Sequence, residues 1–296
     1  MELHIDPNTL ASIKDQVVLI TGSSSGIGKA TVDLCLQKGA KVIAGDLNPP
    51  KDAAPSEDGD GNFLFQQTDV TDWRSLRDLF IQGHTRFSRI DHVFANAGIG
   101  PRGNFLEETF DEDGLLAPPV LTTVQINLLS VINTVRLAVH YLSKDGAGSN
   151  SPVRSIVLSA SASSIQNFAT ADYTTAKHGV LGILRGLTDD LEQSTAPTAV
   201  RLNAVAPSWT ATGLVPREVI ESMGAVVQEP EAVAKGVVTL FGEPARHGEL
   251  LYIWDSRYFE INKAEGGLLD STLKMLPVPV AEDEIMRRLK KAVAGS

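Results

Sequence analysis

The sequence predicts an α/β domain in which buried strands alternate with helices. Three observations point to it: short apolar runs rich in β-branched residues recur along the chain, helical patterns lie between them, and the first run leads through a glycine-rich loop into a helix. That first run is Q-V-V-L-I-T at residues 16–21, and the helical pattern covers residues 29–38. Uninterrupted apolar strands of this kind are typical of parallel sheets that are covered on both faces.

The same reading places six more strands and three further helices. The strands are expected at residues 41–45, 63–67, 91–95, 155–159, 200–205 and 250–254, and the helices at residues 73–87, 120–142 and 281–293. The chain has 296 residues, which suffices for one large α/β domain or two small ones.

Composition narrows the function classes. With 43% hydrophobic and 21% charged residues, the chain is typical of a globular protein. A net charge of −10 and the lack of a basic run argue against nucleic acid as a partner. No apolar run approaches the roughly 20 residues that span a bilayer, and the first residues lack a secretory pattern, so we expect a cytoplasmic protein without membrane contact. The single cysteine, Cys35, excludes an intramolecular disulfide and is interpreted as a small core residue.

The glycine loop predicts a phosphate site. Glycines let the backbone approach a ligand closely, and free N–H groups at a helix start attract anions. The residues of the loop expected to bind a dinucleotide are Gly22, Ser24, Ser25, Gly26, Ile27 and Gly28.

Asp46 predicts which dinucleotide is preferred. It ends the second strand, about 20 residues beyond the glycines, where a carboxylate can bond the ribose hydroxyls of NAD and repel the 2′-phosphate of NADP. Lys29 is the one cation near the loop in the sequence, and Ser25 stands where a basic side chain might have held that phosphate. We therefore expect NAD, with NADP the less favoured cofactor.

The glycine loop also allows a rival interpretation. Gly22 to Gly26 match G-x-S-x-G, the nucleophile elbow of α/β-hydrolases, with Ser24 as nucleophile. That arrangement needs an acid and a histidine later in the chain, which only Asp189 or Asp255 and His178 or His247 could supply. The elbow normally lies deep in the sheet, whereas one predicted strand precedes this loop, so the hydrolase is the weaker hypothesis.

Proton-transfer chemistry is predicted at residues 161–177. Tyr173 and Lys177 are four residues apart, which puts both side chains on one face of a helix. A phenol has an unperturbed pKa of about 10, and a nearby ammonium is expected to lower it towards the working range. Ser161, arriving from the preceding strand, could hold a substrate oxygen while Tyr173 exchanges its proton.

Together these segments resemble the short-chain dehydrogenase/reductase family. The resemblance covers residues 16 to about 255 in the family's order, and its pieces are T-G-S-S-S-G-I-G (21–28), Asp46, Asp69-Val70, N-A-G (96–98), Asn127, the serines near 160, Y-T-T-A-K (173–177) and Pro207. It implies a single doubly wound Rossmann domain with a seven-stranded parallel sheet. It also implies hydride transfer between a nicotinamide and an alcohol or carbonyl.

The resemblance assigns roles to individual residues. Asn127 is expected to kink its helix and to hold a water for proton relay. The family's catalytic serine commonly lies thirteen residues before the tyrosine, where this chain has Ala160. Alignment forward from the strand gives the role to Ser161, with Ser159 as the alternative. Further cofactor contacts are expected from Asp69, Val70, Asn96, Ala97, Gly98, Tyr173, Lys177, Pro207, Thr210 and Thr212, the last through the nicotinamide carboxamide.

The expected organisation is one domain over residues 1–296. Its core covers about 12–256, a substrate lid about 208–229, and a C-terminal extension about 257–296. Candidate apolar walls for a substrate are Trp209, Leu214 and Met223. We expect a homodimer or homotetramer, and no cluster of histidines and cysteines suggests a metal site.

The sequence thus predicts an NAD(H)-dependent oxidoreductase that interconverts a secondary alcohol and a ketone. The segments V-F-A-N-A-G-I and Y-T-T-A-K-H-G-V-L-G-I-L-R-G-L further resemble fungal secondary-metabolite alcohol dehydrogenases of the hydroxyaverantin dehydrogenase type. That resemblance implies a bulky, apolar or polycyclic small-molecule substrate. Two alternatives remain: a non-redox cyclisation or dehydration with a bound nicotinamide cofactor, or a dinucleotide sensor without enzymatic activity.

Overall fold

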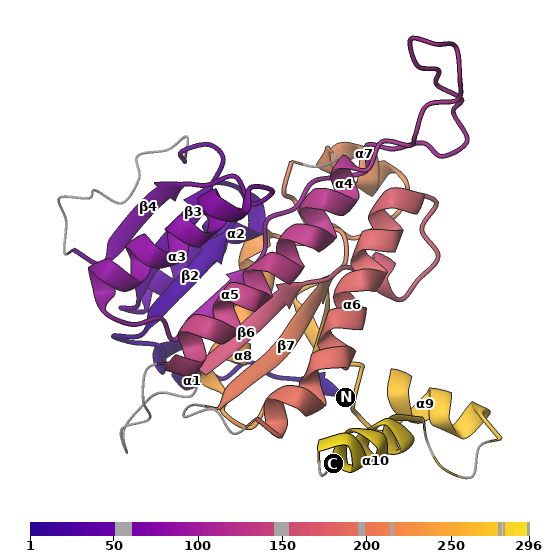
Figure 1. Cartoon of the computed structure of the whole chain (residues 1–296). Coiled ribbons are helices and arrows are strands. Elements are labelled where there is room, and N and C mark those ends of the chain that lie inside the picture. The colour runs from indigo at the N-terminus through magenta and orange to yellow at the C-terminus, as the bar shows by residue number, and fades with distance from the viewer. Residues whose placement is uncertain are drawn as a thin grey trace.

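A single twisted sheet runs through the protein (Figure 1). The computed structural model describes residues 1–50, 61–144, 154–194, 199–213, 216–277, 280 and 282–294. The seven strands expected from the sequence all pair in parallel, in the order β4-β3-β2-β5-β6-β7-β8. They are β2 (Val17–Thr21), β3 (Lys41–Asp46), β4 (Phe63–Gln67), β5 (His92–Ala95), β6 (Arg154–Ser159), β7 (Val200–Pro207) and β8 (Leu250–Trp254).

The expectation of seven strands is corrected by two short ones at the edge beyond β8. In the described part of the chain the sheet has nine strands, because β9 (Arg257–Glu260) and β1 (Glu2–Leu3) add antiparallel pairs. β9 lies within the segment assigned to the C-terminal extension. It follows β8 through Asp255 and Ser256, which both have positive φ, so the chain turns back at once. Two residues of β1 carry too little pattern for sequence analysis to detect.

Helices cover both faces of the sheet, as Figure 1 shows. Apolar side chains of α3 (Trp73–Phe87), α5 (Ser130–Lys144) and α6 (Ala171–Glu192) pack on one face. Those of α1 (Pro7–Ala11), α2 (Gly26–Gln37) and α8 (Pro230–Gly242) pack on the other. Cys35 lies in the second of these cores, where burial raises the pKa of its thiol, as fits the packing role expected for it.

The strand order positions the functional site. From β2 the chain builds β3 and β4 on one side, and then returns to place β5 to β8 on the other. In open α/β sheets the crevice for ligands lies outside the carboxyl ends of the strands at such a reversal. The glycine loop that follows β2 and the segment Asn96–Gly98 that follows β5 meet there.

The helix expected at residues 120–142 is interrupted. It begins as α4 (Thr122–Val124), passes through a π-helical turn at Gln125–Leu129, and continues as α5. Asn127 lies in the π-helical turn and is fully buried. One-turn π segments inside α-helices often mark functional sites.

Three segments extend from the domain. Between β5 and α4 an arm, residues 104–119, projects away from the sheet (Figure 1) and folds on itself through a bridge between Phe110 and Leu116. The short α7 (Arg217–Ser222) lies in the predicted lid. At the C-terminal end, α9 (Leu268–Met275) precedes α10 (Glu282–Ala294), which contacts α6 through an ion pair of 3.3 Å between Arg287 and Asp189. Among the described residues, no helix has the length and apolar character needed to cross a membrane.

Candidate active site

A cavity of about 630 Å³ opens at the carboxyl ends of the parallel strands. Its walls contain every residue that the sequence marked as catalytic or cofactor-binding except Ser24 and Gly28. The marked residues in the wall are Gly22, Ser25, Gly26, Ile27, Asp46, Asp69, Val70, Asn96, Ala97, Gly98, Asn127, Ser161, Tyr173, Lys177, Pro207, Thr210 and Thr212, together with the alternative Ser159.

The glycine loop has the geometry of a cradle for a dinucleotide. Gly22 and Gly26 have φ of +68° and +51°, in the left-handed region that favours glycine. Gly28 does not line the cavity, but a Cβ there would lie 1.9 Å from the Gly22 carbonyl oxygen, so a side chain would force the loop open. Ser25 is the N-cap residue of α2, but its hydroxyl accepts no capping hydrogen bond from the helix N–H groups and is therefore available to a ligand at the helix start.

Ser24 has a structural role, which counts against the hydrolase alternative. Its hydroxyl donates to the carbonyl of Asn48 over 2.6 Å. The two histidines considered as its partners contact main-chain groups elsewhere: His178 at Thr174 and His247 at Thr188. Ser24 is therefore not arranged as a nucleophile.

The carboxylate of Asp46 is held in place at the cavity wall. It accepts from the backbone N–H groups of Ser24 and Asn48, each over 3.0 Å, so both oxygens are fixed. Lys29, the cation considered for a 2′-phosphate, is instead bonded to Asp33 over 2.7 Å along α2. The described loop thus presents a fixed carboxylate at the cavity wall, while the nearby cation is engaged on α2.

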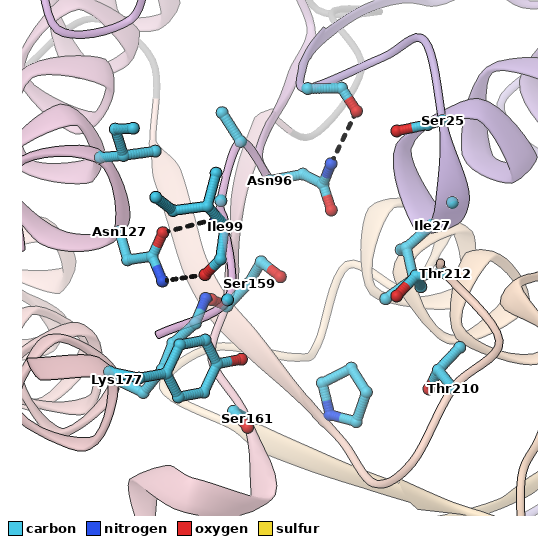
Figure 2. A pocket seen from close by; sticks show the side chains of 18 of the residues that line it. Ser25, Ile27, Asn96, Ile99, Asn127, Ser159, Ser161, Lys177, Thr210 and Thr212 are labelled. Atoms are coloured by element: carbon cyan, nitrogen blue, oxygen red, sulfur yellow. Dashed lines mark hydrogen bonds between the residues drawn. The ribbon is translucent and has the colours of Figure 1, made fainter. Parts of the chain in front are cut away.

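Two asparagines that line the cavity hold neighbouring main-chain segments in place (Figure 2). The Asn96 amide donates to the carbonyls of Thr21 and Gly22, over 3.1 and 3.0 Å, and ties the end of β5 to the glycine loop. The Asn127 side chain pairs with the backbone of Ile99, accepting from its N–H and donating to its carbonyl, each over 2.8 Å. Asn127 thereby anchors the loop that follows Gly98 to the π-helical turn.

Lys177 is a buried ammonium held between a helix and a strand. Its side chain comes from α6, and Nζ donates to the carbonyl of Ser159, at the end of β6, over 2.6 Å. It lies 5.7 Å from the centre of the Tyr173 ring. Burial lowers the pKa of Lys177 to about 8. The helical spacing expected from the sequence therefore brings both side chains into one wall of the cavity.

The pKa of Tyr173 corrects one expectation. Burial raises it, and a side-chain hydrogen bond with Ser161 opposes that shift. The expectation that Lys177 lowers the pKa of Tyr173 is wrong for the protein alone. The ammonium contacts the Ser159 carbonyl and lies over the ring. Burial also reduces the lysine's own tendency to carry charge.

The serines differ in what their side chains contact. The Ser161 side chain lies near enough to the Tyr173 phenol to lower the pKa of that phenol. The Ser161 oxygen accepts from the N–H of Ser163 over 3.2 Å, which leaves its proton to be donated. Ser159 is fixed through its main chain, whose carbonyl binds Lys177. The geometry supports Ser161 over Ser159 as the serine that works with Tyr173.

Two aromatic side chains from loops line part of the cavity. The rings of Phe168 and Trp209 lie 5.7 Å apart, and Trp209 is the one proposed apolar wall that lines the cavity. Met223 is 77% exposed and lies outside the lining, and Leu214 falls outside the described residues. Sequence reasoning missed several lining residues: Ile99, Pro101, Gln166, Phe168, Thr170, Arg217, Ile220 and Val227.

A signal for some of these residues was present in the sequence. Gln166, Phe168 and Thr170 lie between Ser161 and Tyr173, so a segment that joins two residues of one site must border that site. Arg217 and Ile220 gave no comparable signal, because α7 is a short helix whose placement depends on tertiary contacts.

Thr212 lies next to the glycine loop. A Cβ on Gly26 would be 3.0 Å from the Cβ of Thr212. Thr210 is held by Gln228, whose amide donates to its hydroxyl over 3.3 Å and to the carbonyl of Ile253 over 2.9 Å. The start of the predicted lid is thus tied to β8, beside the part of the cavity that the glycines form.

Comparison with known proteins gives the same family that the sequence motifs resemble. Residues 16–221 match the model of the family described as short chain dehydrogenase. The short-chain dehydrogenase/reductase ascJ of Acremonium egyptiacum is 39% identical over 292 residues, covering 97% of this chain and 95% of that protein. Human 15-hydroxyprostaglandin dehydrogenase [NAD(+)] is 29% identical over 266 residues, covering 83% and 93%.

A solved structure is similar as well. The crystal structure of levodione reductase has a TM-score of 0.67 and 26% sequence identity, covering 82% of this chain and 97% of that chain. The resemblance therefore extends from the motifs to the arrangement of the whole α/β core.

The buried Lys177 predicts a pH dependence of stability. Below about pH 8 the lysine is protonated in both the folded and the unfolded chain; between about pH 8 and its usual 10.5, the unfolded chain keeps a proton that the folded chain has lost. Stability conferred by the wild-type lysine therefore rises with pH across this window. Relative to Lys177→Met, the wild-type free energy of unfolding should increase by on the order of 3 kcal/mol over these pH units.

Urea unfolding of both proteins at several pH values measures this difference. Other titrating groups are common to the two chains and cancel in the comparison. Parallel stability curves from pH 7 to 10.5 would show that Lys177 keeps an ordinary pKa in the folded protein.

Proposed function

Since this chain belongs to the short-chain dehydrogenase family, we propose that it is an NAD(H)-dependent enzyme that interconverts a secondary alcohol and a ketone on a bulky, apolar or polycyclic small molecule. Membership makes it an alcohol dehydrogenase or ketoreductase, which sets aside the alternative of a sensor without activity. The observation that carries the proposal is the meeting of Tyr173, Ser161 and Lys177 in one cavity with the glycine loop and Asp46.

The residues present fit a nicotinamide dinucleotide. The glycine loop leaves room for main-chain contact with the pyrophosphate, and Ser25 has an unengaged hydroxyl at the start of α2. Asp46 would hold the ribose hydroxyls, and Thr212 would contact the carboxamide at the nicotinamide end. When bound, NAD supplies the hydride acceptor and, in its oxidised form, a positive charge.

The chain's own residues supply the proton chemistry. In ketone reduction the Tyr173 hydroxyl donates its proton to the carbonyl oxygen, and in alcohol oxidation it accepts that proton. Ser161 hydrogen-bonds to the same oxygen and orients it. Lys177 holds the strand end and would contact the ribose, and the Asn127 turn would support a water relay towards solvent. The Phe168 and Trp209 rings form an apolar wall for the rest of the substrate.

A direct test is incubation of the purified protein with NAD and a panel of secondary alcohols, from simple aliphatic to polycyclic aromatic, while NADH absorbance is followed. We expect turnover that favours the polycyclic members. Binding of NADH without redox turnover of any alcohol or ketone would favour the alternative, a non-redox cyclisation or dehydration. A cytoplasmic location and a homodimer or homotetramer remain predictions.

Cofactor choice depends on Asp46. Its fixed carboxylate should make NAD bind more tightly than NADP, because it bonds the ribose hydroxyls and repels a 2′-phosphate. Titration of both dinucleotides against intrinsic fluorescence measures the gap, which Asp46→Ala should narrow. Equal affinities in the wild type would contradict this assignment.

The serine assignment has a matched control within the chain. Ser161→Ala should lower kcat by roughly 10²-fold or more, the scale of losing one contact to a reacting oxygen. Ser159→Ala should cost much less, because the carbonyl that holds Lys177 belongs to the main chain and stays in place. A larger loss in Ser159→Ala would reverse the assignment.

Tyr173→Phe tests the proton donor itself. The ring and its packing remain while the hydroxyl is lost, so NADH binding should survive and turnover should fall by roughly 10²-fold or more. Fluorescence titration and steady-state rates separate the two effects. Robust alcohol oxidation by the variant would show that Tyr173 is structural.

A further inference from the structure

A buried carboxylate joins the arm to the helix that carries Tyr173. Asp172 is fully buried in the first turn of α6, directly before Tyr173. One of its oxygens, Oδ2, accepts from the backbone N–H groups of Arg102 and Gly103, each over 2.8 Å. The other, Oδ1, accepts from the N–H of Tyr173 over 2.7 Å. Burial acts to raise the pKa of this carboxyl, yet hydrogen bonds from these N–H groups and from Thr123 hold it below its usual value.

The arm begins at a neck, residues 102–103, whose N–H groups bind this carboxylate. A Cβ on Gly103 would lie 2.8 Å from the Val120 carbonyl and 3.5 Å from Oδ2 of Asp172, so the two ends of the arm meet where only a glycine fits. The hydrogen bonds of the described arm residues 104–119 run within the arm, for example from Ala117 to Thr109. The neck is therefore where the arm is fixed to the domain.

The same contacts fix part of the cavity wall. Gly100 and Pro101, which precede the neck directly, line the cavity. Asn127 holds the start of this loop at Ile99, and Asp172 holds its end at Arg102 and Gly103. The wall between these two anchors can move relative to Tyr173 only if one of them gives way.

From these contacts we infer that Asp172 is a positioning residue, one that sets the distance between the Gly100–Pro101 wall and the Tyr173 hydroxyl and so governs how a substrate is seated for proton transfer. The inference rests on the proposed function for its kinetic consequence. The structural consequence, a hydrogen-bonded neck between residues 102–103 and α6, is independent of the proposed function. A carboxylate that served the helix start alone would need only the bond to Tyr173 N–H.

Asp172→Asn is the variant that tests it. An amide of the same shape keeps one acceptor oxygen, so its NH₂ must face either the Tyr173 N–H or the two N–H groups of the neck. Hydrogen exchange followed by mass spectrometry should show amides of residues 99–121 exchanging about tenfold faster or more, the scale of losing a charge-assisted hydrogen bond. Peptides of the glycine loop and of β6 should be unchanged.

The kinetic readout separates positioning from general stability. With the alcohol identified by the panel above, Asp172→Asn should raise KM for the alcohol about tenfold or more while KM for NAD stays within about twofold. Asp190→Asn is the matched control: it lies on the same helix, bonds Lys290 on the surface, and should change neither constant. If the protein shows no turnover, the exchange experiment still decides whether the neck exists.

A milder variant covers the case in which Asp172→Asn does not fold. Thr123→Val removes a hydroxyl that donates to the Gly100 carbonyl over 3.4 Å and that helps to lower the pKa of the Asp172 carboxyl, without changing side-chain shape. It should shift exchange at residues 99–121 and KM for the alcohol in the same direction by less. Unchanged exchange at residues 99–121 in the folded variant would overturn the inference. An equal rise in KM for NAD and for the alcohol would also overturn it, because Asp172 would then support the site only through overall stability.

Discussion

The bond between the Lys177 ammonium and the Ser159 carbonyl is the interaction on which the rest of the site depends. It joins the end of a central strand, β6, to α6, so that the helix bearing Tyr173 stands at a fixed height above the sheet edge. Burying an ammonium is unfavourable, and burial accordingly lowers the pKa of Lys177. A core without a buried ammonium would avoid this free-energy cost. A cation retained at this depth is therefore better explained by chemistry in the cavity than by stability.

Around that bond, the two halves of the cavity are built in different ways. The cofactor half consists mostly of main chain: glycines with positive φ, strand ends, and a carboxylate held by backbone N–H groups. The substrate half consists of side chains from loops and from the lid, such as Phe168, Trp209 and Ile220. Main-chain geometry constrains which residue types can occupy a position, whereas an apolar wall accepts many side chains of similar size.

This difference explains how much could be predicted from the sequence. The parallel strands, the glycine loop, Asp46 and the Tyr173–Lys177 pair follow from local patterns, because each depends on residue type and spacing. The edge strands β1 and β9, the neck at Asp172 and the cavity wall at Arg217 depend on segments that meet only in three dimensions. The pKa of Tyr173 was predicted in the wrong direction because spacing does not show that Lys177 would bond a carbonyl and that burial would dominate.

The arm and the C-terminal helices α9 and α10 lie beyond the sheet and the helices that cover it (Figure 1). The levodione reductase structure covers 82% of the chain, whereas ascJ of Acremonium egyptiacum aligns with 97% of it. That relative is therefore matched over nearly the whole chain. Since Asp172 binds the neck of the arm beside Tyr173, a segment at the surface is connected through two hydrogen bonds to the helix that carries the proposed proton donor. Substrate choice in such enzymes can then change through such segments while the sheet, the glycine loop and the buried lysine stay as they are.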